Sequence, residues 1–177
     1  MKKQLLALIP EIQMIGDAGL RKKTEAVWQE AVSRAGWTIE DLTEIPFTLL
    51  IPGTKVSLIE HTRAVALTSL KIAEVLAGHY GGRVQVNRDI LLAGALLHDI
   101  GKLFEYRKEK GVFIKSRDGE LLRHPISGAA FSFGYGLPAE VVHIIAVHSQ
   151  EGEAGKRTVE AVIVHHADFV NFDCLRA

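Results

Sequence analysis

The sequence predicts an all-α domain. Apolar residues recur at helical spacing along almost the whole chain, and capping residues, prolines and glycines stand at the ends of the periodic segments. The chain has 177 residues, of which 47% are apolar, and its 21 basic residues balance 21 acidic residues. This composition is typical of one globular domain, and it excludes a disordered chain and a broadly basic nucleic-acid-binding coat.

The first expected elements form an N-terminal helical extension over residues 1–55. Asp17 is a candidate N-cap for a helix that stops at Gly36. Two prolines and a glycine interrupt the helical pattern between Ile45 and Thr54. We therefore expect the extension to pack on a core that spans residues 56–177.

The expected core begins with a Ser-x-x-Glu capping box at Ser57, which starts a helix that runs to about Ala77 and is ended by Gly78 and the Gly81-Gly82 pair. The helical period fails between Gly101 and Arg123, where the alternation in VFIK followed by SRDG predicts a small β-hairpin or an ordered loop. Four further helices are expected to begin at Asn87, Pro125, Pro138 and Thr158.

The compartment is predicted from the cysteine count and the apolar runs. Cys174 is the single cysteine, so an intrachain disulfide is excluded and a reducing, cytoplasmic setting is favoured. Pro10 and Glu11 interrupt the apolar start of the chain, which does not fit an export signal. The longest apolar run, Ile90 to Leu97, is much shorter than the ~20 residues that span a bilayer, so no membrane association is expected.

Histidine and aspartate residues provide the candidate chemistry. Six of them are predicted at helix ends or on inward faces: His61, His98, Asp99, His124, His148 and Asp168. A single buried histidine is usually a hydrogen-bonded core residue, and an isolated His-Asp pair carries little information. Six such residues on separate helices would be a costly way to build an inert core. Four imidazoles and two carboxylates without a thiolate suit transition-metal ions, and they suffice for two ions.

The segment LLHDIGK, from Leu96 to Lys102, and the later HHAD before Phe169 carry the most specific pattern. With His61 upstream, this order resembles the HD-domain family of metal-dependent phosphohydrolases over about Val56 to Asp173. Within that family the chain is similar to the HD module of bacterial 3′-to-5′ exoribonucleases and to small HD cyclic phosphodiesterases. The resemblance implies an HD-domain helical bundle with a short irregular or β-hairpin insertion.

The resemblance also implies a dinuclear metal centre. One divalent ion would be held by His61, His98, Asp99 and Asp168, and a second ion, bridged by Asp99, would be held by His124 and His148. Iron or manganese is expected, with zinc, cobalt and nickel as alternatives. Coordination lowers the pKa of water to about 7, which would provide a metal-bridging hydroxide as the nucleophile.

Further residues are expected to act on the substrate. Lys102 matches the lysine that contacts a phosphate oxygen in family members with HD-x-GK, so Asp99 and Lys102 are the expected catalytic residues. Arg123, in an insertion with an excess of basic residues, is the second expected anion contact. His165 lies one helical turn before Asp168 and is expected to donate to that carboxylate or to the leaving group.

The expected function is that of a metal-dependent phosphohydrolase, and more specifically a phosphodiesterase for a nucleotide-like or cyclic phosphate ester. Short RNA is a second candidate substrate, and a homodimer is a candidate assembly. Three alternatives stay open: a diiron oxygenase that uses the same ligands, a non-catalytic nucleotide-binding module and a mononuclear nucleotidase. Oxygen uptake would indicate the oxygenase, and nucleotide binding without turnover would indicate the binding module. Activity that is unaffected by the loss of His124 and His148 would indicate the mononuclear nucleotidase.

Overall fold

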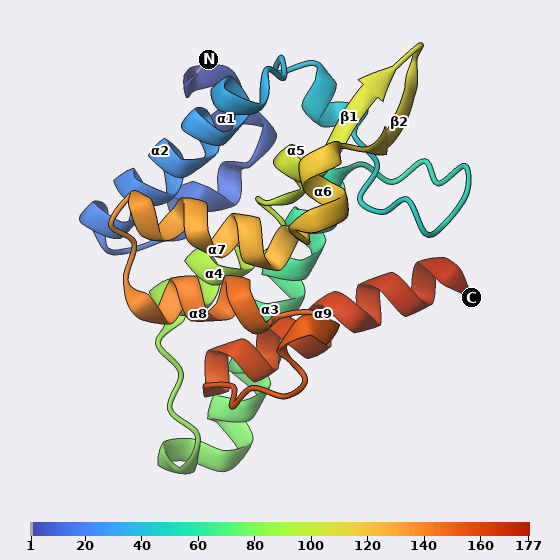
Figure 1. Cartoon of the computed structure of the whole chain (residues 1–177). Helices are drawn as coiled ribbons and strands as arrows, with labels where there is room; N and C mark the ends of the chain where they lie inside the picture. The colour runs from blue at the N-terminus through green and yellow to red at the C-terminus, as the bar shows by residue number, and fades with distance from the viewer. Residues whose placement is uncertain (1) are drawn as a thin grey trace.

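Helices make up most of the regular structure in the computed structural model, which describes residues 2–177 (Figure 1). The α-helices are α1 (Lys2–Leu8), α2 (Ala18–Ala35), α3 (Leu58–Tyr80), α4 (Arg88–Leu97), α5 (Lys102–Glu105), α6 (Arg117–Leu121), α7 (His124–Gly134), α8 (Ala139–Val147) and α9 (Val159–Arg176). The strands β1 (Tyr106–Glu109) and β2 (Val112–Lys115) form an antiparallel hairpin between α5 and α6. The predicted all-α class with a small hairpin insertion is confirmed.

Hydrogen bonds at the helix ends explain why four of the predicted helix starts are correct. The Asp17 side chain accepts from the backbone N–H of Leu20, and Gly36 ends α2 with a φ of 75°. Ser57 and Glu60 form the expected reciprocal capping box at the head of α3. The Asn87 and Thr158 side chains cap α4 and α9. Local hydrogen-bonding chemistry therefore sets these boundaries.

The end of α3 lies three residues beyond Ala77, and of the glycines expected to end the helix Gly81 does so, whereas Gly78 does not. The helix continues through Gly78 to Tyr80 and stops at Gly81, whose φ is 56°. A glycine inside a helix costs only about 1 kcal/mol, so Gly78 does not end α3 by itself. The positive φ of Gly81 is a conformation that most other residues rarely adopt, and this is where the chain leaves the helix.

The turn of the hairpin precedes the VFIK strand. The connection between β1 and β2 is Lys110 and Gly111, with φ values of 51° and 81°. Two residues with positive φ form the turn that matches the twist of a tight hairpin. The SRDG segment instead begins α6, where the Ser116 side chain accepts from the backbone N–H of Gly119.

Helix α4 lies at the centre of the bundle and contacts α2, α3, α8 and α9. All residues from Leu91 to Leu97 are buried. A Cβ atom at Gly94 would overlap the Ile144 side chain of α8, so the absence of a side chain lets α4 and α8 pack closely. This packing brings the C-terminal end of α4, followed by His98 and Asp99, among the neighbouring helices.

We expect Gly94→Ala to destabilise the fold by about 1–3 kcal/mol, because the added methyl group would push α8 away from α4. In a chain of this length the Tm should fall by roughly 2–12 °C. Gly78→Ala is the matched control, since its Cβ would meet nothing within 4 Å and the change should stabilise α3 by about 0.4–1 kcal/mol. Thermal unfolding followed by circular dichroism measures both. A Gly94→Ala variant with the wild-type Tm would contradict this packing.

The residues before α3 pack on the central helices. Trp28 is fully buried, and its indole N–H donates to the carbonyl of Leu96 over 3.0 Å. The indole N–H of Trp37 donates to the carbonyl of Leu103 over 2.8 Å. The division at residues 55 and 56 stays a prediction.

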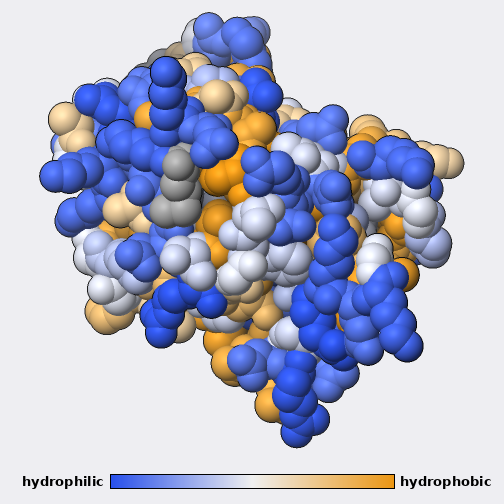
Figure 2. Space-filling view, turned by 90° about the horizontal axis from the view of Figure 1, so that it is seen from above, coloured by the Kyte–Doolittle hydropathy of each residue, from blue (hydrophilic) through white to orange (hydrophobic). Residues whose placement is uncertain are grey.

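The face shown in Figure 2 is mainly hydrophilic, with apolar areas visible between the hydrophilic residues. Among residues 2–177, no helix combines the length and the apolar character needed to cross a membrane.

Candidate metal centre

The predicted ligand residues converge at the C-terminal end of α4. They come from five regions of the chain: His61 in the first turn of α3, His98 and Asp99 after α4, His124 at the start of α7, His148 after α8 and Asp168 in α9. Five of these residues are nearly inaccessible, whereas the Asp168 side chain is 15% exposed. The Asp168 side of the cluster is therefore the one in contact with solvent.

The Asp99 carboxylate lies between two groups of side chains. Its Oδ2 is 3.6 Å from His61 Nε2 and 3.3 Å from His98 Nε2. Its Oδ1 is 3.3 Å from His124 Nε2 and 3.7 Å from His148 Nε2. The two oxygens of one carboxylate thus face two neighbouring clusters.

Asp168 completes the cluster at Asp99 Oδ2. Asp168 Oδ1 lies 2.9 Å from His61 Nε2 and 3.9 Å from His98 Nε2. On the other side, the Nε2 atoms of His124 and His148 are 3.3 Å apart. Each cluster therefore combines histidine nitrogens with at least one carboxylate oxygen.

The donor atoms fit metal ions. Within residues 2–177, His98 Nε2 and Asp99 Oδ1 are buried and have no hydrogen-bond partner, a condition that costs about 1–3 kcal/mol per group. Two triplets have ligand atoms within 4.8 Å of one another: His61, His98 and Asp168, and His98, Asp99 and His148. A divalent cation would give these lone pairs a partner, and imidazole with carboxylate suits transition metals. The clusters can therefore hold divalent metal ions.

The ends of α4 and α8 orient two of the imidazole rings. His98 Nδ1 donates to the carbonyl of Ala95 over 2.6 Å, and His148 Nδ1 donates to the carbonyl of Ile145 over 2.8 Å. The last carbonyls of a helix lack partners within the helix, so they are available as acceptors. Since a carbonyl only accepts, the Nδ1 atoms carry protons, and Nε2 is the nitrogen of each ring that faces Asp99.

The electrostatics keep the carboxylates ionised. Burial alone would raise the pKa of Asp99, but the charges of Lys102 and His98 lower this pKa well below its ordinary value. Burial likewise opposes ionisation of Asp168, and the hydrogen bond from His61 with the charge of His98 lowers its pKa to about 2. Burial lowers the pKa of His124 to about 4, so this imidazole is neutral at pH 7 and able to bind a metal.

Lys102 is buried against the centre. Its Nζ donates to Asp99 Oδ2 and to the carbonyl of Phe47, each over 2.6 Å. Burial alone would lower the pKa of Lys102, but the charge of Asp99 raises this pKa above its ordinary value. The ammonium therefore stays charged beside the carboxylate, and its expected contact with phosphate stays a prediction.

His165 is close to the centre in a different way from the one expected. Its Nδ1 donates to the backbone carbonyl of His148 over 2.6 Å. The Asp168 carboxylate instead pairs with His61. His165 thus holds the segment that carries His148, whereas its predicted contact with substrate stays untested.

Glu105 contacts the centre although the spacing of histidine and aspartate residues does not single it out. Its Oε2 accepts from the backbone N–H of His124 over 2.7 Å and pairs with His124 Nδ1 over 2.9 Å. Its Oε1 lies 3.5 Å from Arg123 Nε and 3.6 Å from Lys115 Nζ. No periodic signal marks Glu105, because the chain changes direction repeatedly between α5 and α7.

Arg123 is partly exposed at the edge of this region. Its side chain is 43% exposed, and Nε lies 3.4 Å from Glu151 Oε1 in addition to its contact with Glu105. An arginine between two carboxylates is partly neutralised. Its expected contact with an anionic substrate stays a prediction.

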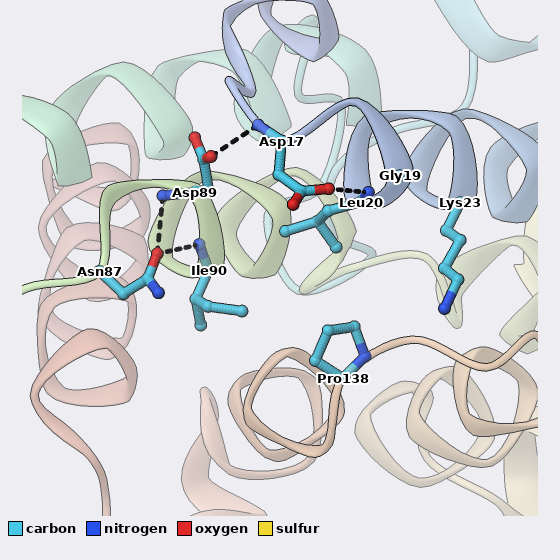
Figure 3. Close-up of a pocket in the computed structure, with 8 residues that line it drawn as sticks. All are labelled: Asp17, Gly19, Leu20, Lys23, Asn87, Asp89, Ile90 and Pro138. Atoms are coloured by element: carbon cyan, nitrogen blue, oxygen red, sulfur yellow. Dashed lines mark hydrogen bonds between the residues drawn. The ribbon is translucent and has the colours of Figure 1, made fainter.

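A separate cavity of about 340 Å³ lies where α2 and α4 begin, beside Pro138 (Figure 3). Asp17 and Asn87 point at backbone N–H groups of their own helices, and Asp89 accepts from the backbone N–H of Asp17. The cavity adjoins the N-terminal end of α4, about 15 Å along the helix from His98. It is therefore distinct from the candidate metal centre.

Inward-facing histidines and aspartates from five regions of the chain define a helical domain that could hold divalent metal ions. The family model for the HD domain matches residues 58–171, and the chain belongs to this family. The family predicted from LLHDIGK and HHAD is thereby confirmed.

Relatives within the family include two kinds of enzyme. The chain is 44% identical over 113 residues to dihydroneopterin 2′,3′-cyclic phosphate phosphodiesterase from Methanocaldococcus jannaschii. The aligned region covers 63% of this chain and 44% of that protein. Ribonuclease Y of Acidothermus cellulolyticus is 33% identical over 96 residues, or 54% of this chain and 17% of that one. Ribonuclease Y of Thermobifida fusca is 32% identical over 112 residues, which are 63% of this chain and 19% of that protein.

The matched region spans less than half the length of each of these relatives. No solved structure matches the chain.

Proposed function

We propose that the chain is a metal-dependent phosphodiesterase that acts on a small nucleotide-like or cyclic phosphate ester. The observation that carries this proposal is the position of Asp99, whose two oxygens face two clusters of imidazole nitrogens. The similarity to a cyclic phosphate phosphodiesterase favours a cyclic phosphodiester over other anions. Short RNA is a second candidate substrate, supported by the similarity to ribonuclease Y.

The proposed centre holds two divalent ions. The first would be held by His61, His98, Asp99 and Asp168, and the second by Asp99, His124 and His148. Iron or manganese suits these nitrogen and oxygen donors, with zinc, cobalt or nickel as alternatives. When bound, the ions would polarise the phosphate ester and lower the pKa of water to about 7.

The charge of the proposed site favours an anionic substrate. Two divalent ions outweigh the two carboxylates, Asp99 and Asp168, and Lys102 adds a positive charge beside Asp99. We assign Lys102 and Arg123 contacts with the phosphate oxygens, because Lys102 pairs with Asp99 and Arg123 directly precedes His124 in the chain. His165 is assigned a place beside the substrate, because it lies one helical turn before Asp168 on α9 and contacts the backbone of His148.

The test is a hydrolysis assay on protein reconstituted anaerobically with Mn²⁺ or Fe²⁺. We expect release of a phosphomonoester from 2′,3′-cyclic nucleotides, and loss of this activity after chelation. Phosphomonoesters and short oligoribonucleotides in the same panel define the preference. Failure to hydrolyse any phosphoester over the metal panel would contradict the proposal. Oxygen uptake with an anionic organic substrate would then favour the oxygenase, and tight nucleotide binding without turnover would favour a binding module.

We expect Lys102→Met to lower kcat/KM by roughly 10²–10³-fold while both ions are retained. The reason is that the variant loses a cation at the phosphate, whereas bound ions can replace the ammonium as the counter-charge of Asp99. Metal content by mass spectrometry and hydrolysis rates on the same sample measure the two effects. Lys71→Met is the matched control, because Lys71 is exposed and pairs with Glu74 on α3. Equal losses of metal and activity would contradict the role in phosphate binding.

A further inference from the structure

The Nδ1 atoms of His98, His148 and His124 have different kinds of hydrogen-bond partner. His98 and His148 each follow a helix and donate from Nδ1 to a carbonyl of that helix. His124 begins α7, and the start of a helix offers unpaired N–H groups rather than carbonyls. His124 therefore needs an acceptor from another element to hold its ring with Nε2 toward Asp99.

Glu105, the last residue of α5, provides this acceptor. One oxygen, Oε2, pairs both with the backbone N–H of His124 and with Nδ1 of its ring. The residue is only 2% exposed. A carboxylate that accepts from a ligating imidazole makes that imidazole a stronger base than a carbonyl partner does. His124 thus differs chemically from His98 and His148.

The surrounding chain fixes Glu105 in place. Its carbonyl accepts from the backbone N–H of Ser116 over 2.8 Å, and a Cβ atom at Gly119 would overlap its backbone. Arg123 and Lys115 approach its other oxygen and offset the buried negative charge. A carboxylate held on both sides in this way is pre-organised to orient a ring.

We propose that Glu105 is a positioning residue that raises the affinity of the ion on the His124 and His148 side of the centre, without affecting the ion on the His61 side. The effect passes through His124, whose ring Glu105 orients and polarises. The inference rests on the proposed two-ion centre. The two metal sites of this centre would then differ, because the affinity of one site depends on Glu105, which is not itself a ligand.

The test is Glu105→Gln, which keeps the size of the side chain and an oxygen that can accept, but removes the charge. Mn²⁺ binding to the full chain is measured by titration calorimetry and by the metal content after dialysis. These two measurements separate the two binding steps. We expect the affinity of one step to fall by about 10–100-fold and the other to stay unchanged. Glu109→Gln is the control, because Glu109 pairs with Arg107 on the exposed hairpin and should leave both steps unchanged.

The outcomes distinguish this inference from the proposed function. Two ions in the wild type with unchanged affinities in Glu105→Gln would overturn the inference alone, whatever happens to the Tm. A wild-type chain that binds only one ion would overturn the two-ion centre and the inference with it. His124→Ala identifies which binding step Glu105→Gln weakens. We expect His124→Ala to lose that same step, and loss of the other step would contradict the proposal.

Discussion

Asp99→Ala is expected to abolish phosphodiesterase turnover, with a fall in kcat/KM of at least about 10³-fold. Asp99 is the side chain whose oxygens face both clusters, so its removal should cost both ions rather than one. Hydrolysis of a 2′,3′-cyclic nucleotide and metal content of the same preparation measure the effect. An Asp99→Ala variant that keeps turnover would contradict the assignment of the centre.

A second variant separates chemistry from folding. Asp99→Ala leaves the Lys102 ammonium buried without its partner, which should cost about 3–5 kcal/mol of stability. Asp99→Ala combined with Lys102→Met removes both charges and should recover much of that loss. We expect the double variant to be folded by circular dichroism and still inactive. If activity returned together with stability, the loss in the single variant would be a folding defect.

Gly101→Ala is expected to have the largest effect on stability among the glycine variants, above about 3 kcal/mol. A Cβ atom at Gly101 would overlap the backbone carbonyl of His124 and lie 2.8 Å from the backbone nitrogen of Gly128. These obstacles are backbone atoms of α7, whereas Gly94 meets a side chain that can shift. The Tm should fall by more than roughly 6 °C, and His124 should move away from Asp99.

The control for Gly101→Ala is Gly134→Ala at the end of α7, where a Cβ atom would meet nothing within 4 Å. Its Tm should stay within about 2 °C of the wild type. Thermal unfolding of both variants, with and without Mn²⁺, provides the comparison. A Gly101→Ala variant with unchanged Tm would contradict the close approach of α5 and α7, and with it the steric requirement for glycine in LLHDIGK.

The parts of the fold that local chemistry determines could be predicted from the sequence. The capping box and N-caps at Asp17, Ser57, Asn87 and Thr158 depend on residues within three positions of one another, and all four helices begin there. The inward direction of the histidines follows from the helical period. The family follows from a short motif, LLHDIGK, and is confirmed by the match over residues 58–171.

The features that were missed depend on tertiary contacts. The position of the hairpin turn, at Lys110 and Gly111, depends on the strand pairing, because the SRDG segment also carries turn-forming residues. Glu105 lies 19 positions from His124 in the sequence, across the irregular insertion, so no spacing rule connects the two. The backbone partner of His165 likewise depends on how the segment after α8 returns to α9.

Anomalous diffraction from crystals soaked in Mn²⁺ would test the two-ion centre most directly. We predict two peaks per chain on opposite sides of the Asp99 carboxylate, one beside His61, His98 and Asp168 and the other beside His124 and His148. A single peak, or peaks away from Asp99, would contradict the dinuclear centre.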